Sequence, residues 1–259
     1  VGFFSVGPSY RRILGGVFKL SNNRFIMGHS EEGDLKPTNV KAFPKPEQLR
    51  QRKPVGLYAK YILPRIINFT CSLGPAMRQR EKVVPLAQCR VLEVGIGSGL
   101  NLPFYDPAKV SRLWGLDPSV EMWNIRDKRR GTLGFDVEFI EGSAEEIPLE
   151  VGSIDTVVVT YSFCTIPDVI GSLVDIRCVL RPGGEFPFCE HGAASDESIR
   201  KWQNRLTTLW KRMGGGCHLN RPIALLLERG GFQIRNMETM YLPGWKPVSF
   251  NYWGTAVPT

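Results

Sequence analysis

The sequence has no hydrophobic run of about 18 residues, the length that a membrane-spanning helix needs. We therefore expect no transmembrane helix and predict a cytoplasmic protein, with peripheral membrane contact left open. The composition is otherwise that of an ordinary globular chain, with 42% hydrophobic and 22% charged residues among 259. A chain of this length buries enough surface to fold without disulfides or metals.

Closely spaced cysteines are also absent, because the chain contains no CxxC pair and no CxxxCxxC cluster. This absence argues against a structural zinc or iron–sulfur site. We expect no metal site and predict free thiols in a reducing compartment. The six cysteines are Cys71, Cys89, Cys164, Cys178, Cys189 and Cys217.

Most of the chain lacks a net charge of either sign. Residues 1–53 carry 10 Lys/Arg against 4 Asp/Glu, whereas the remainder carries 23 against 21. Because an enzyme that acts on nucleic acid usually has a basic catalytic body, nucleic acid is not an expected partner. Residues 1–54 also lack periodicity and contain several prolines, so we expect an irregular or disordered basic extension. Residues 55–259 are expected to form a single domain, and the sequence gives no indication of its oligomeric state.

Short apolar runs recur from residue 90 onward, and their length is typical of buried strands. Two further runs near the C-terminus are joined through PGWKP, a connection so short that they must pair antiparallel. The expected parallel strands are 90–94, 113–116, 137–140, 154–160 and 184–190, and the expected C-terminal pair is 232–242 and 248–257.

Helical patterns separate these strands. They are expected near 98–105, from Ser119, over 169–180 and 196–213, and over 221–229 with Asn220 as its cap. The alternation predicts an α/β fold, a Rossmann-like seven-stranded mixed sheet of five parallel strands plus a C-terminal antiparallel hairpin, with helices on both faces. Pro187 departs from this pattern because proline removes a ladder donor, so it marks either a bulge or an anomaly in the fifth strand.

Residues 55–87 precede the first strand and are apolar and partly helical. Two roles suit them equally, a lid over a ligand cleft or a cap on the sheet. The stretch 55–73 also has the tyrosines and basic residues of a membrane-surface helix, although a lid or core helix is the favoured interpretation.

A glycine-rich turn directly follows the first strand: Glu93-Val-Gly95-Ile-Gly97-Ser-Gly99. Glycine allows positive φ and close approach of a ligand to the backbone. The third glycine of a dinucleotide turn and the Gly-Lys-Ser/Thr of a phosphate loop are both missing. An acidic residue two places before the first glycine favours a ligand with a cationic group, such as the amino-acid end of S-adenosylmethionine.

Two later strand ends carry polar residues suited to a nucleoside. Asp117 closes the second strand, where a carboxylate accepts the hydroxyls of a ribose or caps the following helix. Ser143, Ala144 and Glu145 follow the third strand, where an adenine edge would be read. Thr160, at the end of the fourth strand, is expected to join the same pocket.

The motifs together resemble those of the class I S-adenosylmethionine-dependent methyltransferases. They occur in the family's order over residues 86–190 as VLEVGIGSG, GLDPS, EGSAEEIPL, IDTVVVTYSFCTIPD and VLRPGGE. The resemblance implies that residues 55–259 form a methyltransferase domain that binds S-adenosyl-L-methionine. By this resemblance Glu93 and the glycines hold the methionine part and Asp117 the ribose. Ser143 replaces the aspartate of many members, and Glu145 is a candidate substitute.

The C-terminal half is similar to alkyl-thiol methyltransferases in FCTIPD, FCEHG, GGGCHLNRP and the aromatic hairpin. The first-half motifs also resemble bacterial phospholipid and quinone methyltransferases. We therefore predict methyl transfer to a small-molecule substrate that can be lipophilic: a thiol, an amine phospholipid or a quinone-type ring.

Candidate catalytic residues lie at the ends of the fourth and fifth strands, where open α/β sheets bind ligands. They are Tyr161, Glu190 and His191, with His191 either a general base or a structural histidine. Cys164 more often fills a core as a small hydrophobe, and the same caution applies to Cys217 and His218.

Two alternative functions remain open at this point. One is an RNA or protein methyltransferase recruited through the basic extension, although the chain lacks the NPPY and Pro-Cys strings of base-methylating families. The other is a membrane-surface binding protein that keeps the fold without the activity.

Overall fold

A computed structural model of the chain describes residues 17–21, 24–28, 57–125 and 133–259. Its contacts divide the chain into two units, Val1–Lys53 and Pro54–Thr259. In the first unit, β1 (Val17–Ser21) and β2 (Arg24–Gly28) pair antiparallel. This part of the extension is therefore not irregular as expected, because two short apolar stretches separated by only two residues pair as a hairpin. The rest of the predicted extension lies outside the described residues.

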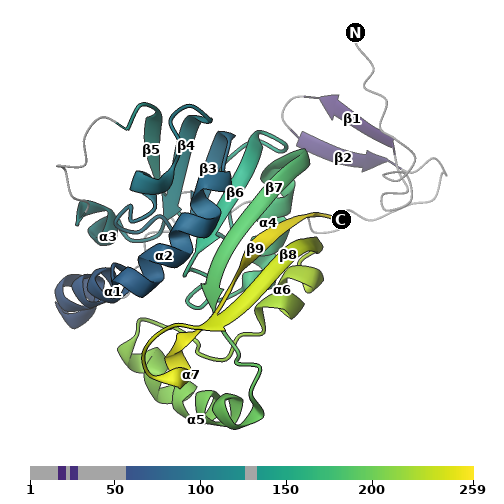
Figure 1. Ribbon diagram of the computed structural model, residues 1–259. Helices are drawn as coiled ribbons and strands as arrows, with labels where there is room; N and C mark the ends of the chain where they lie inside the picture. Colours follow the sequence, from purple (N-terminus) through teal and green to yellow (C-terminus); the bar gives the residue numbers. More distant parts are fainter. Residues whose placement is uncertain (1–16, 22–23, 29–56, 126–132) are drawn as a thin grey trace. The chain divides into compact units, whose positions relative to one another are not determined.

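The larger unit contains a seven-stranded sheet in the order β5-β4-β3-β6-β7-β9-β8 (Figure 1). Strands β3 to β7 pair parallel, and β9 lies antiparallel between β7 and β8. The predicted fold class is confirmed, including the C-terminal hairpin. The strands are β3 (Cys89–Val94), β4 (Val110–Asp117), β5 (Asp136–Glu141), β6 (Ile154–Thr160), β7 (Leu180–His191), β8 (Phe232–Tyr241) and β9 (Phe250–Pro258).

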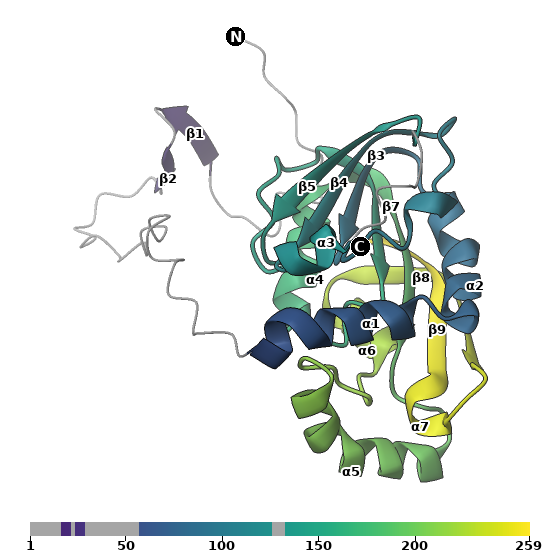
Figure 2. The same cartoon turned by 90° about the vertical axis from the view of Figure 1, so that its left-hand side faces the viewer.

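Helices cover both faces of this sheet. In both views α2 lies on one face, whereas α4 and α6 lie on the other; α1 crosses the end of the strands and α5 lies beyond it (Figures 1 and 2). The helical segments are η3 (Tyr58–Ile62), α1 (Leu63–Cys71), α2 (Gly74–Val83), η4 (Val84–Leu86), η5 (Leu102–Phe104), α3 (Val120–Asn124), α4 (Val169–Val179), α5 (Glu197–Met213), α6 (Ile223–Arg229) and α7 (Lys246–Ser249). Within the described residues, none of these helices combines the length and hydropathy needed to span a bilayer.

The core has two layers because successive strand residues point to opposite faces. Leu92 of β3 packs with Phe186 of β7 and Leu173 of α4 in one layer. Val91, the neighbour of Leu92, packs with Val83 at the end of α2 in the other. The sheet is thus buried on both sides, which leaves the ends of its strands to carry function.

Two helix predictions are corrected by the structure. No α-helix follows the glycine-rich turn, where residues 98–101 form turns and only η5 follows. Gly97 and Gly99 have left-handed φ values of +52° and +72°, and Pro103 lacks a donor, so a regular helix cannot start there. The helix predicted over 221–229 begins at Ile223 after Pro222, and the Asn220 side chain donates to Asn204 instead of capping it.

Pro187 lies inside β7 opposite Thr255 of β9. The β7–β9 register runs without a shift from Phe186 to His191, so no bulge occurs at Pro187. The irregularity in the β6–β7 pairing lies instead between Ile154 and Thr156. Nothing in the structure explains a proline at this interior position.

Candidate active site

A cavity of about 340 Å³ lies at the carboxyl ends of β3, β4 and β6. Most of the residues that the sequence predicts to bind the cofactor line this cavity. Helix α1 contributes Ile67 and Cys71 to its lining, and α2 contributes Arg80. The predicted residues that line it are Gly95, Gly97, Asp117, Ser143, Ala144 and Thr160; the predicted residues that do not are Glu93, Gly99 and Glu145.

The glycine-rich turn forms one wall of this cavity. Gly95 has φ +76°, and a Cβ there would lie 2.0 Å from the Ser162 hydroxyl, so the position excludes any side chain. A Cβ on Gly97 would lie 3.4 Å from Met122 Cε, and both Gly97 and Met122 line the cavity. A larger side chain at Gly97 would therefore occupy ligand space and strain a left-handed backbone.

Asp117 lies beside this bare backbone. Its Oδ2 accepts the Gly97 N–H at 2.9 Å and its Oδ1 accepts the Ser119 N–H at 2.8 Å. Burial raises the pKa of the carboxyl, and the two backbone donors oppose that rise. Each oxygen keeps a free lone pair, so the carboxylate can accept further hydroxyl donors from the cavity.

Glu93 lies beneath the cavity rather than on its wall. Its Oε1 accepts the Asn101 amide at 2.9 Å and its Oε2 accepts the Tyr105 hydroxyl at 2.7 Å. Burial raises the pKa of this carboxyl to about 7, against hydrogen bonds from Tyr105 and Asn101 and the charge of Arg80. The position favours an indirect role, in which Glu93 orders Asn101.

Arg80 is a site residue that the sequence did not reveal. Its guanidinium is buried, lines the cavity, and donates to Asn101 Oδ1 at 2.8 Å and to Thr160 Oγ1 at 2.5 Å. Its Nε is buried without a hydrogen-bond partner among the described residues. The surrounding string MRQREK is typical of a solvated helix face, so no signal marked this arginine as buried. A buried cation with an unpartnered donor is suited to an anionic ligand group.

The turn after β5 places its residues unequally. Ser143 and Ala144 line the cavity, whereas Glu145 is exposed and does not. Glu145 Oε1 accepts the Asp168 N–H at 2.6 Å, which holds the start of α4. As positioned, Glu145 supports the loop rather than facing the cavity.

A second cavity of about 560 Å³ adjoins the first and shares Ile67, Cys71, Tyr161 and Thr165 with it. The described residues around it include no Asp, Glu, Lys or Arg. It is lined by Tyr58, Leu63, Ile66, Ile67, Thr70, Cys71, Leu73, Pro75, Ala76, Tyr161, Cys164, Thr165, His191, Trp210, Met213, Gly214, Cys217, Leu219, Leu242, Pro243, Gly244, Trp245, Val248, Ser249 and Asn251. This composition is typical of a pocket for an apolar ligand.

Tyr161 stands between the two cavities, with a left-handed φ of +54°. Its hydroxyl donates to Asn251 Oδ1 at 2.8 Å, and burial raises its pKa well above 10. The side chain is therefore a neutral phenol at physiological pH and cannot serve as a base.

Glu190 lines neither cavity and is fully buried. Its Oε1 accepts the backbone N–H groups of Ser162 and Phe163, at 2.7 and 3.1 Å. Burial raises its pKa to about 7. These contacts fix the turn after β6, so the structure indicates a positioning role.

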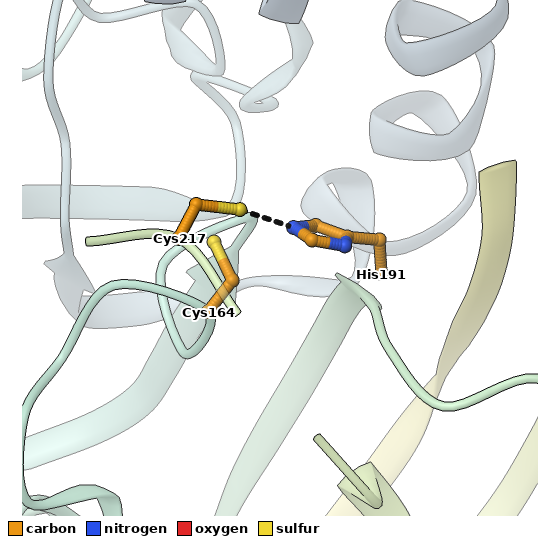
Figure 3. Close-up of side chains that lie close together, drawn as sticks. All are labelled: Cys164, His191 and Cys217. Carbon is orange, nitrogen blue, oxygen red and sulfur yellow. Dashed lines mark hydrogen bonds between the residues drawn. The ribbon is translucent and has the colours of Figure 1, made fainter. Parts of the chain in front are cut away.

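His191, Cys164 and Cys217 lie together in the wall of the larger cavity (Figure 3). His191 Nε2 is 3.3 Å from Cys217 Sγ, and the three donor atoms all lie within 4.8 Å of one another. A hydrogen bond from Cys164, together with the neighbouring imidazole, lowers the pKa of Cys217 to about 4 despite burial. Burial alone would lower the pKa of His191, but the charges of Cys217 and Glu190 raise it.

Comparison with known proteins agrees with this geometry. Residues 92–188 match the family model described as a methyltransferase domain. The chain is 32% identical to the thiol S-methyltransferase TMT1A of Homo sapiens, over 74% of this chain and 84% of that protein. It is 31% identical to the demethylmenaquinone methyltransferase of Thermus thermophilus, over 51% of this chain and 66% of that protein.

A solved structure supports the fold independently. The crystal structure of a SAM-dependent methyltransferase from Thermotoga maritima superposes with a TM-score of 0.54 at 19% identity, over 77% of this chain and 99% of that chain. The glycine-rich turn, the strand order and these relatives lead to one assignment. The chain belongs to the class I S-adenosylmethionine-dependent methyltransferases, and S-adenosylmethionine is its cofactor.

Proposed function

We propose that this enzyme methylates the sulfur of a small, lipophilic thiol. The observation that carries the proposal is the larger apolar cavity, which shares a wall with the cofactor cavity and has no charged Asp, Glu, Lys or Arg among its described lining residues. An acceptor held there would lie next to the methyl donor, and alignment is most of what methyl transfer requires.

The smaller cavity fits the cofactor on three counts. Asp117 has free lone pairs for ribose hydroxyls, Gly97 leaves the backbone bare, and Arg80 offers an unpartnered buried donor to a carboxylate. Ser143 and Ala144 would border the adenine, and Thr160 would support Arg80. When bound, S-adenosylmethionine supplies an electrophilic methyl group on a sulfonium. Glu93 and Gly99 would act indirectly, through the shape of the turn and the position of Asn101.

The lining of the larger cavity discriminates among the predicted acceptors. A phospholipid headgroup would need a cation for its phosphate, and the described lining offers no Lys or Arg. A ring carbon or an amine needs a base, but the described lining offers no carboxylate, and its one imidazole, His191, is already in contact with Cys217 Sγ. A thiol has an unperturbed pKa of about 8.5, so it ionises with the least help. We assign His191 to the wall beside the acceptor sulfur, Tyr161 to alignment of that sulfur and Glu190 to support of the turn after β6.

The relatives point in the same direction. A protein named as a thiol S-methyltransferase is matched over most of both chains, whereas the quinone-type relative is matched over about half of this one. The alternative of an RNA or protein methyltransferase is not favoured, because these relatives are named for small-molecule acceptors.

A methyl-transfer assay tests the acceptor directly. The purified enzyme is supplied with S-adenosylmethionine and a panel of alkyl and aryl thiols, amine phospholipids and quinone precursors. Methylated product is expected from lipophilic thiols and not from the other classes. Preferred methylation of a quinone ring or a phospholipid amine would overturn the proposal.

Gly97→Arg provides the matched control. Its side chain fills the cofactor cavity, so calorimetry is expected to show no binding of S-adenosylmethionine and the assay no product. Product from this variant would show that the activity does not come from the assigned cavity.

A further inference from the structure

Three soft or borderline ligand atoms converge on one point in the wall of the larger cavity. Cys164 lies in the turn after β6, His191 ends β7, and Cys217 lies between α5 and α6 (Figure 3). Their Sγ and imidazole nitrogen atoms lie within 4.8 Å of one another, and no other such group of His, Cys and carboxylates occurs among the described residues. No sequence spacing signals this group, because the residues are far apart in the chain.

The separations suit a tetrahedral ion. With Zn–S bonds of about 2.3 Å and Zn–N bonds of about 2.1 Å, tetrahedral ligands lie roughly 3.5–3.8 Å apart. The Cys217 Sγ to His191 Nε2 distance is 3.3 Å, and the remaining pairs fall within 4.8 Å. Movements of about an ångström or less would complete the geometry.

The backbone holds the three residues in this arrangement. The His218 N–H donates to the Cys164 carbonyl at 2.8 Å, which ties the Cys217 loop to the turn after β6. Glu190, next to His191, binds the backbone N–H groups of Ser162 and Phe163 in the same turn. These bonds do not involve the ligand atoms, whose own contacts include that between Cys217 Sγ and His191 Nε2 and a weak hydrogen bond from Cys164 Sγ to the Tyr161 carbonyl. An ion would replace these contacts within an arrangement that the backbone already holds.

We propose that Cys164, His191 and Cys217 bind one zinc ion, whose fourth position opens into the larger cavity. Two thiolates and one imidazole are a ligand set that zinc prefers, and catalytic zinc sites combine three protein ligands with one open position. All three residues line the cavity, so an acceptor can reach that position.

The role of this ion rests on the proposed function. The acceptor thiol gives its proton to solvent as its sulfur binds zinc, since a coordinating thiol is deprotonated. That sulfur then forms a bond to the methyl carbon, and the methyl–sulfonium bond breaks with its electron pair on the departing sulfur. The neutral thioether is a weaker ligand and leaves. The cavities share Tyr161 and Thr165, and Thr165 is the neighbour of Cys164, so the zinc would sit close to the wall between acceptor and cofactor.

Cobalt substitution tests the site without relying on activity. The full chain, purified under reducing conditions and freed of metal, is titrated with Co²⁺. We expect one ion per chain, a thiolate-to-cobalt charge-transfer band and the intense visible bands of tetrahedral cobalt, all displaced by one equivalent of Zn²⁺. Cys164→Ser, Cys217→Ser and His191→Gln should each weaken binding at least tenfold, whereas Cys178→Ser, an exposed cysteine outside the group, should not.

A lipophilic thiol added to the cobalt protein is expected to shift the visible bands, because its sulfur enters the open position. The site would be overturned if the protein failed to bind cobalt while a free-thiol titration showed that all its cysteines were reduced. If that metal-free protein still methylated thiols, the proposed function would stand without the zinc site. Stoichiometric cobalt binding without any thiol methylation would keep the site and remove the proposed function. A spectrum unchanged in Cys217→Ser, with melting temperatures confirming the fold of each variant, would also overturn the site.

Discussion

Arg80 is a buried cation whose partners come from different parts of the sheet edge. Its contacts with Asn101 and Thr160 hold it against the cofactor cavity, while its Nε has no partner among the described residues. A free donor on a buried guanidinium costs stability unless a ligand supplies the acceptor. The residue is therefore expected to contribute more to binding than to folding.

Arg80→Leu is expected to weaken S-adenosylmethionine binding by about 10- to 100-fold, the range for hydrogen bonds to charged groups. Calorimetry measures the change. Lys82→Leu on the same helix removes an equal charge from outside the cavity, where Lys82 stacks on Trp253, and should bind as the wild type does. A decarboxylated cofactor analogue should not distinguish Arg80→Leu from the wild type. Equal losses for both ligands would show that Arg80 acts only through the fold.

Glu93 makes folding stability depend on pH. Its pKa in the folded protein is about 7, against an ordinary value of 4.5, because burial disfavours the charged form. The stability that this carboxyl contributes is present below pH 4.5 and is lost as the pH rises through 7. Relative to Glu93→Gln, the free energy of unfolding of the wild type should fall by on the order of 3 kcal/mol over this interval. Urea unfolding at several pH values measures the difference, and a constant difference would contradict the assigned cause.

Among single residues, the sequence predicted the site residues that follow strand ends and missed those whose place in the site depends on distant parts of the chain. Asp117 and Gly97 are adjacent in space because neighbouring parallel strands end at the same edge, a rule that needs no coordinates. Arg80 and the Cys164–His191–Cys217 group depend on how α2 and the loop before α6 pack. No local pattern encodes such packing, so the expectation of no metal site rested on cysteine spacing alone.

Helix α1 is an element that lines both cavities. Ile67 and Cys71 line each of them, and the Asn68 amide accepts the Ser98 hydroxyl from the glycine-rich turn. One face of the helix touches the ligand sites while Ile62 just before it and Phe69 within it remain exposed. We therefore propose that α1 acts as a lid over the two cavities rather than only as a cap on the sheet.

Cofactor binding is expected to slow amide hydrogen exchange in residues 63–71 by tenfold or more, because contacts inside the cavity hold the lid closed. Helix α4, on the far face of the sheet, provides the internal reference and should not change. Mass spectrometry of the free and bound enzyme measures both. Equal protection of α1 and α4 would indicate general stabilisation rather than a lid.

The elements themselves were predicted well where burial and periodicity agree. Strand β6 was placed at its observed bounds because a β-branched, fully buried run has few alternatives. The helix expected after the glycine-rich turn was wrong because positive φ at Gly97 and Gly99 and the proline at 103 outweigh the apolar pattern. The hairpin β1–β2 was missed because its strands are short and lie in a basic, proline-containing stretch.

On the scale of the whole larger unit, many large apolar side chains are exposed, and five of them also line the larger cavity: Tyr58, Ile66, Leu73, Met213 and Trp245. The exposed side chains occur around η3 and α1, on α5 and in the loop before α7. The Tyr58 hydroxyl of η3 donates to the Met213 carbonyl at the end of α5, which links these two elements. Residues 54–259 are nearly neutral, with 23 Lys/Arg against 21 Asp/Glu, so net charge adds little to this surface. The exposed apolar side chains themselves favour peripheral contact with a membrane. The exposed members are Leu57, Tyr58, Tyr61, Ile62, Ile66, Phe69, Leu73, Trp202, Leu209, Met213 and Trp245.

The wild type is expected to float with vesicles that contain anionic lipid. The double variant Ile62→Glu and Phe69→Glu should reduce the floated fraction at least tenfold, since each buried apolar side chain contributes about 1.5–3 kcal/mol. Neither residue is among the described residues that line the two cavities, so methylation of a soluble thiol should persist. Val151→Glu, at a side chain 83% exposed before β6, is the control and should float normally. Absence of the wild type from the vesicle fraction would dismiss membrane contact.

Because one short helix forms part of the wall of both chambers, an outward movement of that helix would widen both at once. If such a movement accompanies product release, the rates at which the two products leave should respond together to a change in this helix, even where the rate of the bond-making step does not.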